Sequence, residues 1–217
     1  MPKTLYLVRH AKSDWNTGET DFDRPLNKRG LRDAPEMGRR LKDRGDVPEL
    51  IVCSTAKRAQ QTLAALDLGV ANVIHEPRIY EASTGDLLEL VQKLDDSVDA
   101  AMLIGHNPSM TWLASMLSGV RIEGMPTCSV ATIVRDTNRW EAAGAMAAIV
   151  SGCYVVSSNR VGPGRGEVRF GGNGFAFAPD GTCIARTSAA QPVVSIEIDP
   201  ERVVRQRAEY PCYVDEL

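Results

Sequence analysis

The chain has 217 residues, of which 43% are hydrophobic and 24% charged, and its formal net charge is −3 at pH 7. These values are typical of a soluble globular protein with one large domain, or one domain and part of another. They give no reason to expect a nucleic acid or an anionic membrane surface as a partner. The five cysteines are widely spaced and form no C-x-x-C pair, which argues against a zinc site. Reduced thiols and apolar runs too short to cross a bilayer predict a cytoplasmic protein.

Predicted strands and helices alternate along the first two-thirds of the chain. Apolar runs predict strands, and apolar residues at helical spacing predict helices. The strands are expected at 5–8, 50–53, 72–76, 100–104 and 127–134, and the helices at 31–44, 56–66, 86–94 and 108–117. This alternation predicts the α/β class, with a mostly parallel sheet flanked by helices. Antiparallel pairing is an option for the last strand.

Two helix starts carry recognisable capping residues. Ser54 or Thr55 is expected to cap the helix at 56–66, and Asn107 the helix that begins with Pro108.

Basic and imidazole side chains follow three of these strands. Arg9 and His10 end the first strand, Arg58 lies one helical turn beyond the second, and His106 follows the fourth. The carboxyl ends of parallel strands share one edge of a sheet, where ligands bind. We therefore expect these four side chains to converge, although each alone would more often be an ordinary polar residue. His75 has no such neighbours and is interpreted as a plain loop or strand residue.

The expected cluster suits phosphate chemistry. Arginine offers forked donors that match phosphate oxygens, and a helix N-terminus adds backbone donors. A neutral imidazole is a competent nucleophile near neutral pH. One histidine could attack phosphorus while the other, protonated beside the bound phosphate, shares the developing charge. This chemistry needs neither a metal nor a cofactor.

Four motifs carry a resemblance to a known family. Over about residues 1–140 the chain resembles the histidine phosphatase superfamily, and within it the SixA-type phosphohistidine phosphatases. The matching residues are Leu7-Val8-Arg9-His10-Ala11-Lys12-Ser13, Arg24-Pro25-Leu26…Gly30, Ser54…Arg58-Ala59…Thr62 and Gly105-His106-Asn107-Pro108. The resemblance implies a phosphoglycerate-mutase-like fold. Ala11 stands where most of the superfamily has glycine, as in the SixA-type branch.

The resemblance also implies roles for single residues. His10 would be the nucleophile and form a covalent phosphohistidine intermediate. The phosphate pocket would be completed by Arg9, Arg58 and His106, together with Asn107. Many superfamily members use a glutamate as general acid, for which Glu81 is the nearest candidate. Glu81 is equally well a loop residue, because the SixA-type branch manages without a well-defined acid; Asp14 and Asp23 are weaker candidates.

The last third of the chain has a different pattern of predicted elements. An Ala-rich helix is predicted at 140–152, a strand with a turn at 153–162, and a Gly-rich loop at 164–174. A hairpin follows, with strands at 175–178 and 183–187 around Pro179-Asp180-Gly181. A further strand is expected at 193–198, and then a short helix capped by Asp199.

This last part resembles the C-terminal part of nitrilase-type carbon–nitrogen hydrolases. The resemblance rests on Tyr154…Asn159-Arg160-Val161-Gly162, Phe170-Gly171-Gly172-Asn173-Gly174…Pro179-Asp180-Gly181 and Ile196-Glu197-Ile198-Asp199…Arg207. That family's Glu, Lys and Cys lie upstream of the corresponding segment, so no catalytic residue is carried over, and Cys153 is interpreted as structural. We expect a phosphatase domain at 1–139 and a smaller, incomplete α/β sandwich fragment, rich in strands, at 140–217.

Half a layered sandwich leaves apolar surface uncovered. The fragment is therefore expected to be poorly ordered, to dock on the phosphatase domain, or to form a homo-oligomer with a second chain.

Three functions remain open from the sequence. The first is a metal-independent phosphatase acting on phosphohistidine or a small phosphomonoester. Its partner would be a phosphohistidine-bearing signalling or phosphotransfer protein, or a small phosphorylated molecule. The second is a non-catalytic phosphate-binding or interaction module, and the third is a carbon–nitrogen hydrolase relative without its catalytic triad.

Overall fold

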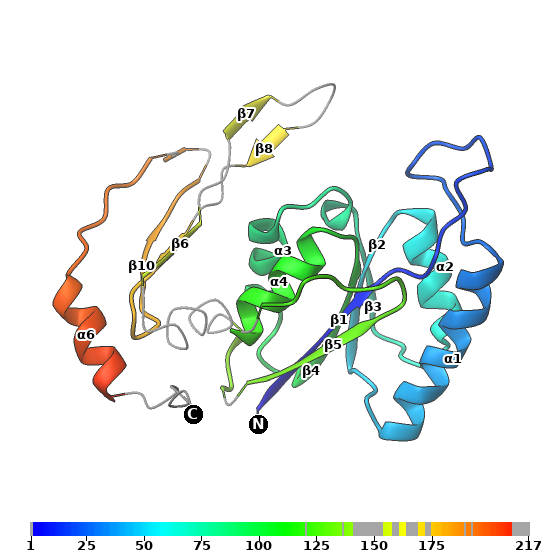
Figure 1. The fold of residues 1–217 in the computed structure, drawn as a ribbon, viewed down its shortest axis with the longest axis horizontal. Coiled ribbons are helices and arrows are strands. Elements are labelled where there is room, and N and C mark those ends of the chain that lie inside the picture. Colours follow the sequence, from blue (N-terminus) through cyan, green and yellow to red (C-terminus); the bar gives the residue numbers. More distant parts are fainter. Residues whose placement is uncertain are drawn as a thin grey trace.

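The computed structural model describes two parts of the chain (Figure 1). In the first, strands and helices alternate, and the second contains short strands and one helix. The described residues are 2–119, 121–135, 137–140, 154–157, 161–163, 169–171, 175–188, 190–191 and 193–209. Within them, no helix is long and apolar enough to cross a membrane.

The first part is a five-stranded sheet. Figure 1 shows helices between its strands. Its elements are β1 (Lys3–Arg9), α1 (Lys28–Arg44), β2 (Leu50–Ser54), α2 (Lys57–Leu66), β3 (Val73–Glu76), η1 (Pro77–Ile79), α3 (Thr84–Gln92), β4 (Ala100–Gly105), α4 (Ser109–Ser118) and β5 (Val130–Arg135). The strand order is β3-β2-β4-β1-β5. Only β5 is antiparallel to its neighbour, β1. The predicted α/β fold with a mostly parallel sheet is confirmed.

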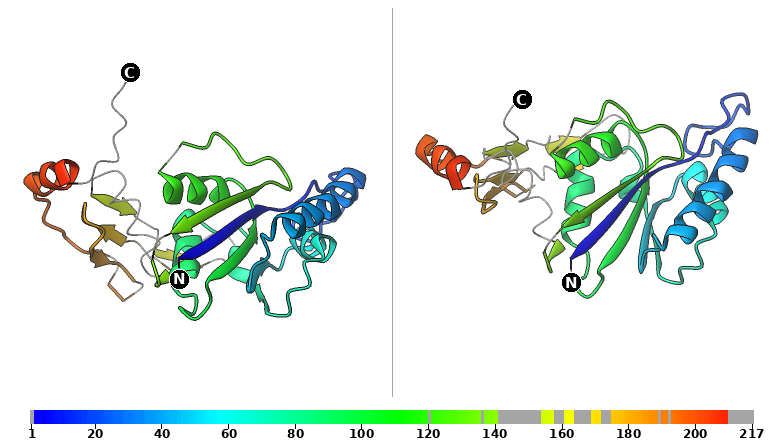
Figure 2. Two further views of the ribbon diagram at one scale, coloured as in Figure 1. Left: turned by 90° about the horizontal axis from the view of Figure 1, so that it is seen from below. Right: turned by 60° about the horizontal axis from the view of Figure 1, so that its bottom comes forward.

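Both faces of the sheet are covered, which explains why the inner strands β2 and β4 are almost entirely apolar and buried. In β1, Leu5 and Leu7 belong to a core cluster that contains residues of α3 and α4. Tyr6 and Val8 belong to a second cluster, with residues of α1 and α2. Figure 2 shows the two helix pairs on opposite faces of the sheet. The sheet is therefore a rigid base whose strand ends can hold side chains in fixed positions.

Both predicted helix caps were wrong. Ala56 is the N-cap of α2 and has no polar side-chain atom with which to cap the helix. The Ser54 hydroxyl is hydrogen-bonded to His106 and accepts from the Ala56 backbone nitrogen at 3.3 Å. Pro108 holds the N-cap position of α4, and the Asn107 side chain bonds to other partners. In both cases a residue that could cap a helix is used at the sheet edge instead.

Helix α1 begins at Lys28, three residues before the predicted start. The Asn27 side chain accepts a hydrogen bond from the Gly30 backbone nitrogen at 2.9 Å, which is a regular N-cap interaction. The early start matters for the site, because it brings the first turn of α1 against the loop that follows β1.

The second part contains short strands and one helix. Strands β9 (Phe175–Phe177), β10 (Cys183–Arg186) and β6 (Val155–Ser157) form a sheet of order β10-β9-β6. The hairpin around the Pro-Asp-Gly turn is confirmed, with an antiparallel β9–β10 pair. Helix α6 (Pro200–Glu209) is preceded, as predicted, by Asp199, whose carboxylate accepts from the Glu201 backbone nitrogen.

Two predictions for this part were wrong, and others fall outside the described residues. Residues 193–198 form no strand, although their alternation suggested one. Part of the predicted Gly-rich loop is strand β8 (Arg169–Gly171), which pairs with β7 (Val161–Pro163). The predicted helix at 140–152, apart from its first residue, and Cys153 lie outside the described residues.

The two parts share a buried cluster. Phe177 of β9 and Trp140 are each only 2% exposed and belong to the core cluster of α3 and α4. The Trp140 indole also donates a hydrogen bond to the Val98 carbonyl at 2.8 Å. Of the three alternatives for the C-terminal fragment, these contacts favour docking on the first domain. The boundary between 139 and 140 stays a prediction.

Candidate active site

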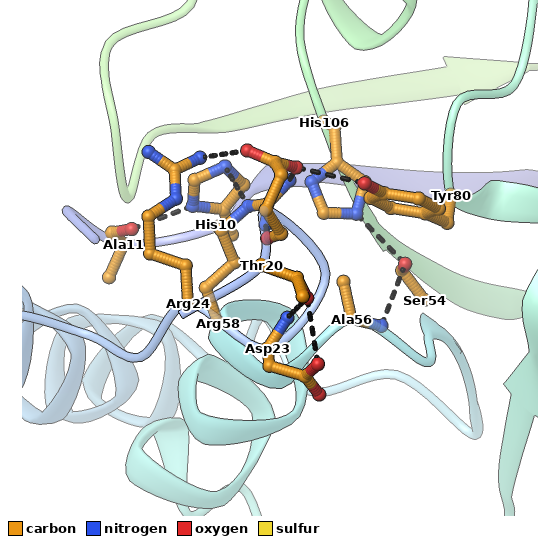
Figure 3. A network of polar contacts seen from close by, with 11 residues as sticks. His10, Ala11, Thr20, Asp23, Arg24, Ser54, Ala56, Arg58, Tyr80 and His106 are labelled. Carbon is orange, nitrogen blue, oxygen red and sulfur yellow. Dashed lines mark hydrogen bonds and ion pairs between the residues drawn. The ribbon is translucent and has the colours of Figure 1, made fainter. Parts of the chain in front are cut away.

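A pocket of about 350 Å³ lies at the edge of the sheet where β1 and β4 end. Its lining includes all six residues that sequence reasoning proposed for the site, namely Arg9, His10, Arg58, Glu81, His106 and Asn107. Figure 3 shows the two imidazole rings and the surrounding polar network. The expected convergence of residues from separate strand ends is therefore found in the structure.

The His10 ring is fixed in one orientation. Its Nδ1 lies 2.7 Å from the Ala11 carbonyl oxygen, which can only accept, so Nδ1 carries the proton. Nε2 therefore holds a lone pair and accepts from the Nε of Arg58 at 3.2 Å. The backbone nitrogen of His10 donates to the Gly105 carbonyl of the neighbouring strand at 3.0 Å. These contacts present an unprotonated Nε2 beside an arginine.

The histidine is neutral at pH 7 in the unliganded pocket. Burial lowers the pKa of His10 from 6.5 to about 4, and the positive charges of Arg58 and Arg9 act in the same direction. The hydrogen bond to the Ala11 carbonyl opposes this shift but does not cancel it. A buried neutral imidazole has the protonation state that a nucleophile needs.

The loop that carries His10 is held by residues of the recognised motifs. The Ala11 backbone nitrogen donates to the Thr62 hydroxyl of α2 at 2.9 Å. The Asn27 backbone nitrogen donates to the Lys12 carbonyl at 2.9 Å. A side-chain Cβ at Gly30 would lie 2.3 Å from that same carbonyl oxygen, so glycine is required for the approach.

His106 lies next to His10, with the two ring centroids 5.0 Å apart. Its Nε2 is hydrogen-bonded to the Ser54 hydroxyl at 2.8 Å. Its Nδ1 is buried and has no hydrogen-bond partner among the described residues. Burial, followed by the neighbouring His10 and Arg58, lowers the pKa of His106 to about 3. A bound phosphate dianion would favour protonation of this ring, because an opposite charge raises the pKa of an imidazole.

Arg58 connects His10 to a loop that precedes α1. It is 5% exposed, and besides its contact with His10 it donates to the carboxylate and the backbone carbonyl of Asp21. The Asp21 carboxylate also accepts from Arg24 at 2.6 Å and from the Tyr80 hydroxyl at 3.0 Å. Asp21 thus holds both arginines in place at the pocket wall.

Sequence reasoning missed Asp21 and Tyr80 as members of the site. The single available signal was Arg24 in the Arg-Pro-Leu motif, to which no role was given. Burial alone would raise the pKa of Asp21, but the bond from Tyr80 and the charges of Arg58 and Arg24 lower it overall. Asp21 is therefore a carboxylate at neutral pH and is poorly suited to donate a proton.

Arg9 and Asn107 meet at a shared backbone acceptor. The Arg9 guanidinium donates to the Met125 carbonyl at 2.6 Å, and the Asn107 amide donates to the same carbonyl at 3.1 Å. The Nε of Arg9 is buried without a hydrogen-bond partner among the described residues. The segment that contains Met125 thus keeps both side chains at the pocket.

The candidate acids differ in position. Glu81 lines the pocket, on a turn where its φ is +57°. The carboxylates of Asp14 and Asp23 bond locally, to the Asn16 backbone nitrogen and to the Thr20 hydroxyl, and neither residue is in the described lining. Of the three acids weighed from the sequence, Glu81 is therefore the one whose position suits proton donation.

Both parts of the chain match protein families. Residues 5–110 match the histidine phosphatase superfamily (branch 1), and residues 129–208 match the carbon–nitrogen hydrolase family. The second match begins before β5, yet β5 pairs with β1 in the sheet of the first domain. The structure therefore places the first residues of the hydrolase-like match in the phosphatase sheet.

Similar proteins come from bacteria and plants. An uncharacterized Mycobacterium tuberculosis protein is 34% identical over 143 residues, which cover 61% of this chain and 89% of that protein. An uncharacterized chloroplastic protein of Arabidopsis thaliana is 35% identical over 157 residues, covering 66% of this chain and 72% of the relative.

Solved structures show the same fold. A crystal structure from Agrobacterium tumefaciens, provisionally named as the phosphohistidine phosphatase SixA, is 33% identical with a TM-score of 0.56 and covers 61% of this chain and 91% of that chain. The protein histidine phosphatase SixA complexed with tungstate is 16% identical with a TM-score of 0.54, covers 86% of this chain and 97% of that chain, and supports the fold alone. Together with the extent of the bacterial match, these findings establish that the chain belongs to the histidine phosphatase superfamily.

Proposed function

We propose that the protein is a phosphohistidine phosphatase that works through a covalent phosphoryl group on Nε2 of His10. The observation that carries the proposal is the unprotonated Nε2, held by the Ala11 carbonyl on one side of the ring and Arg58 on the other. Neutral His10 can attack phosphorus at pH 7 because burial lowers its pKa to about 4.

The reaction has two steps. In the first, the Nε2 lone pair forms a bond to phosphorus, and the bond from phosphorus to the leaving-group nitrogen breaks with its electron pair left on that nitrogen. The departing imidazole is then neutral, because its other ring nitrogen already carries a proton. In the second, water attacks the phosphoryl group on His10 and gives up a proton to the solvent, the bond from phosphorus to Nε2 breaks, phosphate leaves and Nε2 regains its lone pair. Arg9, Arg58 and His106 would stabilise the charge on the phosphoryl oxygens, with Asn107 as a further donor, and no metal is required.

The leaving group decides how much acid catalysis is needed. A protonated phosphohistidine has a labile N–P bond, so it can leave without a strong acid. An alkyl phosphomonoester gives a poorer leaving group, for which Glu81 is the acid that we propose. A preference for phosphohistidine therefore fits a pocket with one exposed glutamate and no buried carboxylic acid among its described lining.

A panel of substrates tests this function. We expect the protein to hydrolyse a phosphohistidine peptide with kcat/KM at least about tenfold above that for a phosphoserine peptide of the same sequence, with an aryl phosphate in between. Addition of EDTA should leave these rates unchanged. Equal or greater activity on the phosphoserine peptide would favour the small-phosphomonoester alternative, and no turnover of any of the three would exclude a phosphatase.

The depressed pKa of His10 makes a prediction for pH dependence. Acidification protonates Nε2 and removes the lone pair, so activity is lost as the pH falls through the pKa of the free enzyme. With a pKa of about 4, the nucleophile stays neutral well below 6.5. The check is kcat/KM from about pH 8 to about pH 4, corrected for ionisation of the substrate, alongside ¹⁵N NMR of the His10 ring. A ring titration centred near the ordinary histidine value would contradict the prediction.

A further inference from the structure

Trp15 is an exposed aromatic residue on the wall of the phosphate pocket. Its side chain lines the same cavity as His10 and Arg58, yet the residue is 71% exposed. Aromatic side chains commonly line ligand pockets, where they contact the bound molecule.

The indole is held against the pocket by Arg24. The guanidinium carbon of Arg24 lies 3.4 Å from the centroid of the Trp15 ring, which is close stacking of a cation on an aromatic face. Arg24 is 7% exposed and is itself fixed by its ion pair with Asp21. One face of the indole is therefore covered by a rigid partner, and its high exposure leaves the other face open.

The backbone around Trp15 is also anchored. The Asp14 nitrogen donates to the Pro25 carbonyl at 2.8 Å, and the Asn16 nitrogen donates to the Asp14 carboxylate at 3.0 Å. An exposed side chain on a tethered backbone, with one face already stacked, loses little conformational freedom when a ligand covers the other face. The arrangement is a preorganised aromatic surface.

We propose that Trp15 is a specificity residue that stacks on planar aromatic leaving groups, and in particular on the imidazole ring of a phosphohistidine. This inference rests on the proposed function, because it places a phosphoryl group between His10 and the leaving group. When Nε2 of His10 attacks, the leaving group must lie on the opposite side of phosphorus, toward the mouth of the pocket. In phosphohistidine the planar ring is bonded directly to phosphorus, whereas phosphoserine presents a tetrahedral carbon that cannot stack.

The experiment compares leaving groups in matched variants. The measured quantity is the ratio of kcat/KM for a phosphohistidine peptide to kcat/KM for the corresponding phosphoserine peptide, with an aryl phosphate as a second planar substrate. We expect Trp15→Ala to lower this ratio about fivefold to tenfold, mainly through a higher KM for the planar substrates. Trp15→Phe should keep the ratio within about twofold of the wild type, because a smaller ring still stacks.

A second exposed indole provides the control. Trp112 of α4 is 66% exposed and is not among the described residues that line the pocket, so Trp112→Ala removes a similar surface without touching the site. Its ratio should equal that of the wild type. The inference is overturned if Trp15→Ala leaves the ratio unchanged, or lowers kcat/KM equally for all substrates. Failure of the proposed function would look different, because it would appear in the wild-type protein itself, as no turnover or as equal or greater activity on the phosphoserine peptide.

Discussion

Replacing His10 by alanine is expected to reduce kcat for a phosphohistidine peptide by at least about 10⁴-fold, because the covalent route then has no nucleophile. The variant should still fold, since the ring lies at the end of β1, and the core residues Leu7 and Val8 are unchanged. Steady-state kinetics measures the loss. Mass spectrometry after an alkaline quench, which preserves phosphohistidine, should detect a phosphorylated protein in the wild type and none in His10→Ala.

His75 provides a matched control for this variant. It lies exposed on β3, away from the pocket lining, so His75→Ala removes an imidazole without affecting the proposed chemistry. Its kcat should match that of the wild type. Substantial turnover by His10→Ala, with a phosphoryl group trapped on another residue, would contradict the assignment of the nucleophile.

Arg58→Lys is expected to lower kcat/KM by about 100-fold to 1,000-fold although it conserves the charge. The guanidinium contacts Nε2 of His10 with one nitrogen and Asp21 with the other two. A lysine presents one compact ammonium group, which cannot span both partners and phosphate oxygens at once. Kinetics with the phosphohistidine peptide gives the size of the loss.

The control for the arginine is Arg78→Lys. Arg78 forms a surface ion pair with Glu76, and its side chain is 57% exposed, so the exchange should leave kcat/KM within about twofold. If Arg58→Lys also left kcat/KM within about twofold of the wild type, the several N–H donors of the Arg58 guanidinium would have no part in catalysis. The site would then be better described as a general attraction for anions.

The C-terminal part contacts the first domain through Phe177. None of the described residues that line the pocket comes from the C-terminal strands β6 to β10. Phe177 joins the core cluster of α3 and α4, so part of its apolar surface is covered by the first domain. This contact favours docking of the C-terminal part on the first domain.

The sequence by itself determined the order and type of the elements in the first domain. Buried parallel strands need apolar residues on both faces. Continuous apolar runs such as Leu50–Cys53 and Ala100–Ile104 can therefore be recognised as buried strands from the sequence. The ends of such strands meet at one sheet edge, so Arg9, His10 and His106 could be assigned to a common site before any distance was known. In the last third, the alternation of apolar and polar residues at 193–198 led to a strand prediction that was wrong. Such alternation forms part of a sheet only where a neighbouring strand pairs with it.

Only the tertiary structure decided the partners of these side chains. Ser54 has the chemistry of a helix cap, but the His106 ring lies within hydrogen-bond reach of its hydroxyl and provides the partner. Asp21 resembles any loop carboxylate until the fold brings Arg58 and Tyr80 to it from 37 and 59 positions away. The pKa of His10 likewise depends on burial, which comes from residues distant in the chain. Local patterns fix local structure, whereas charge and contact at the site depend on what the fold brings together.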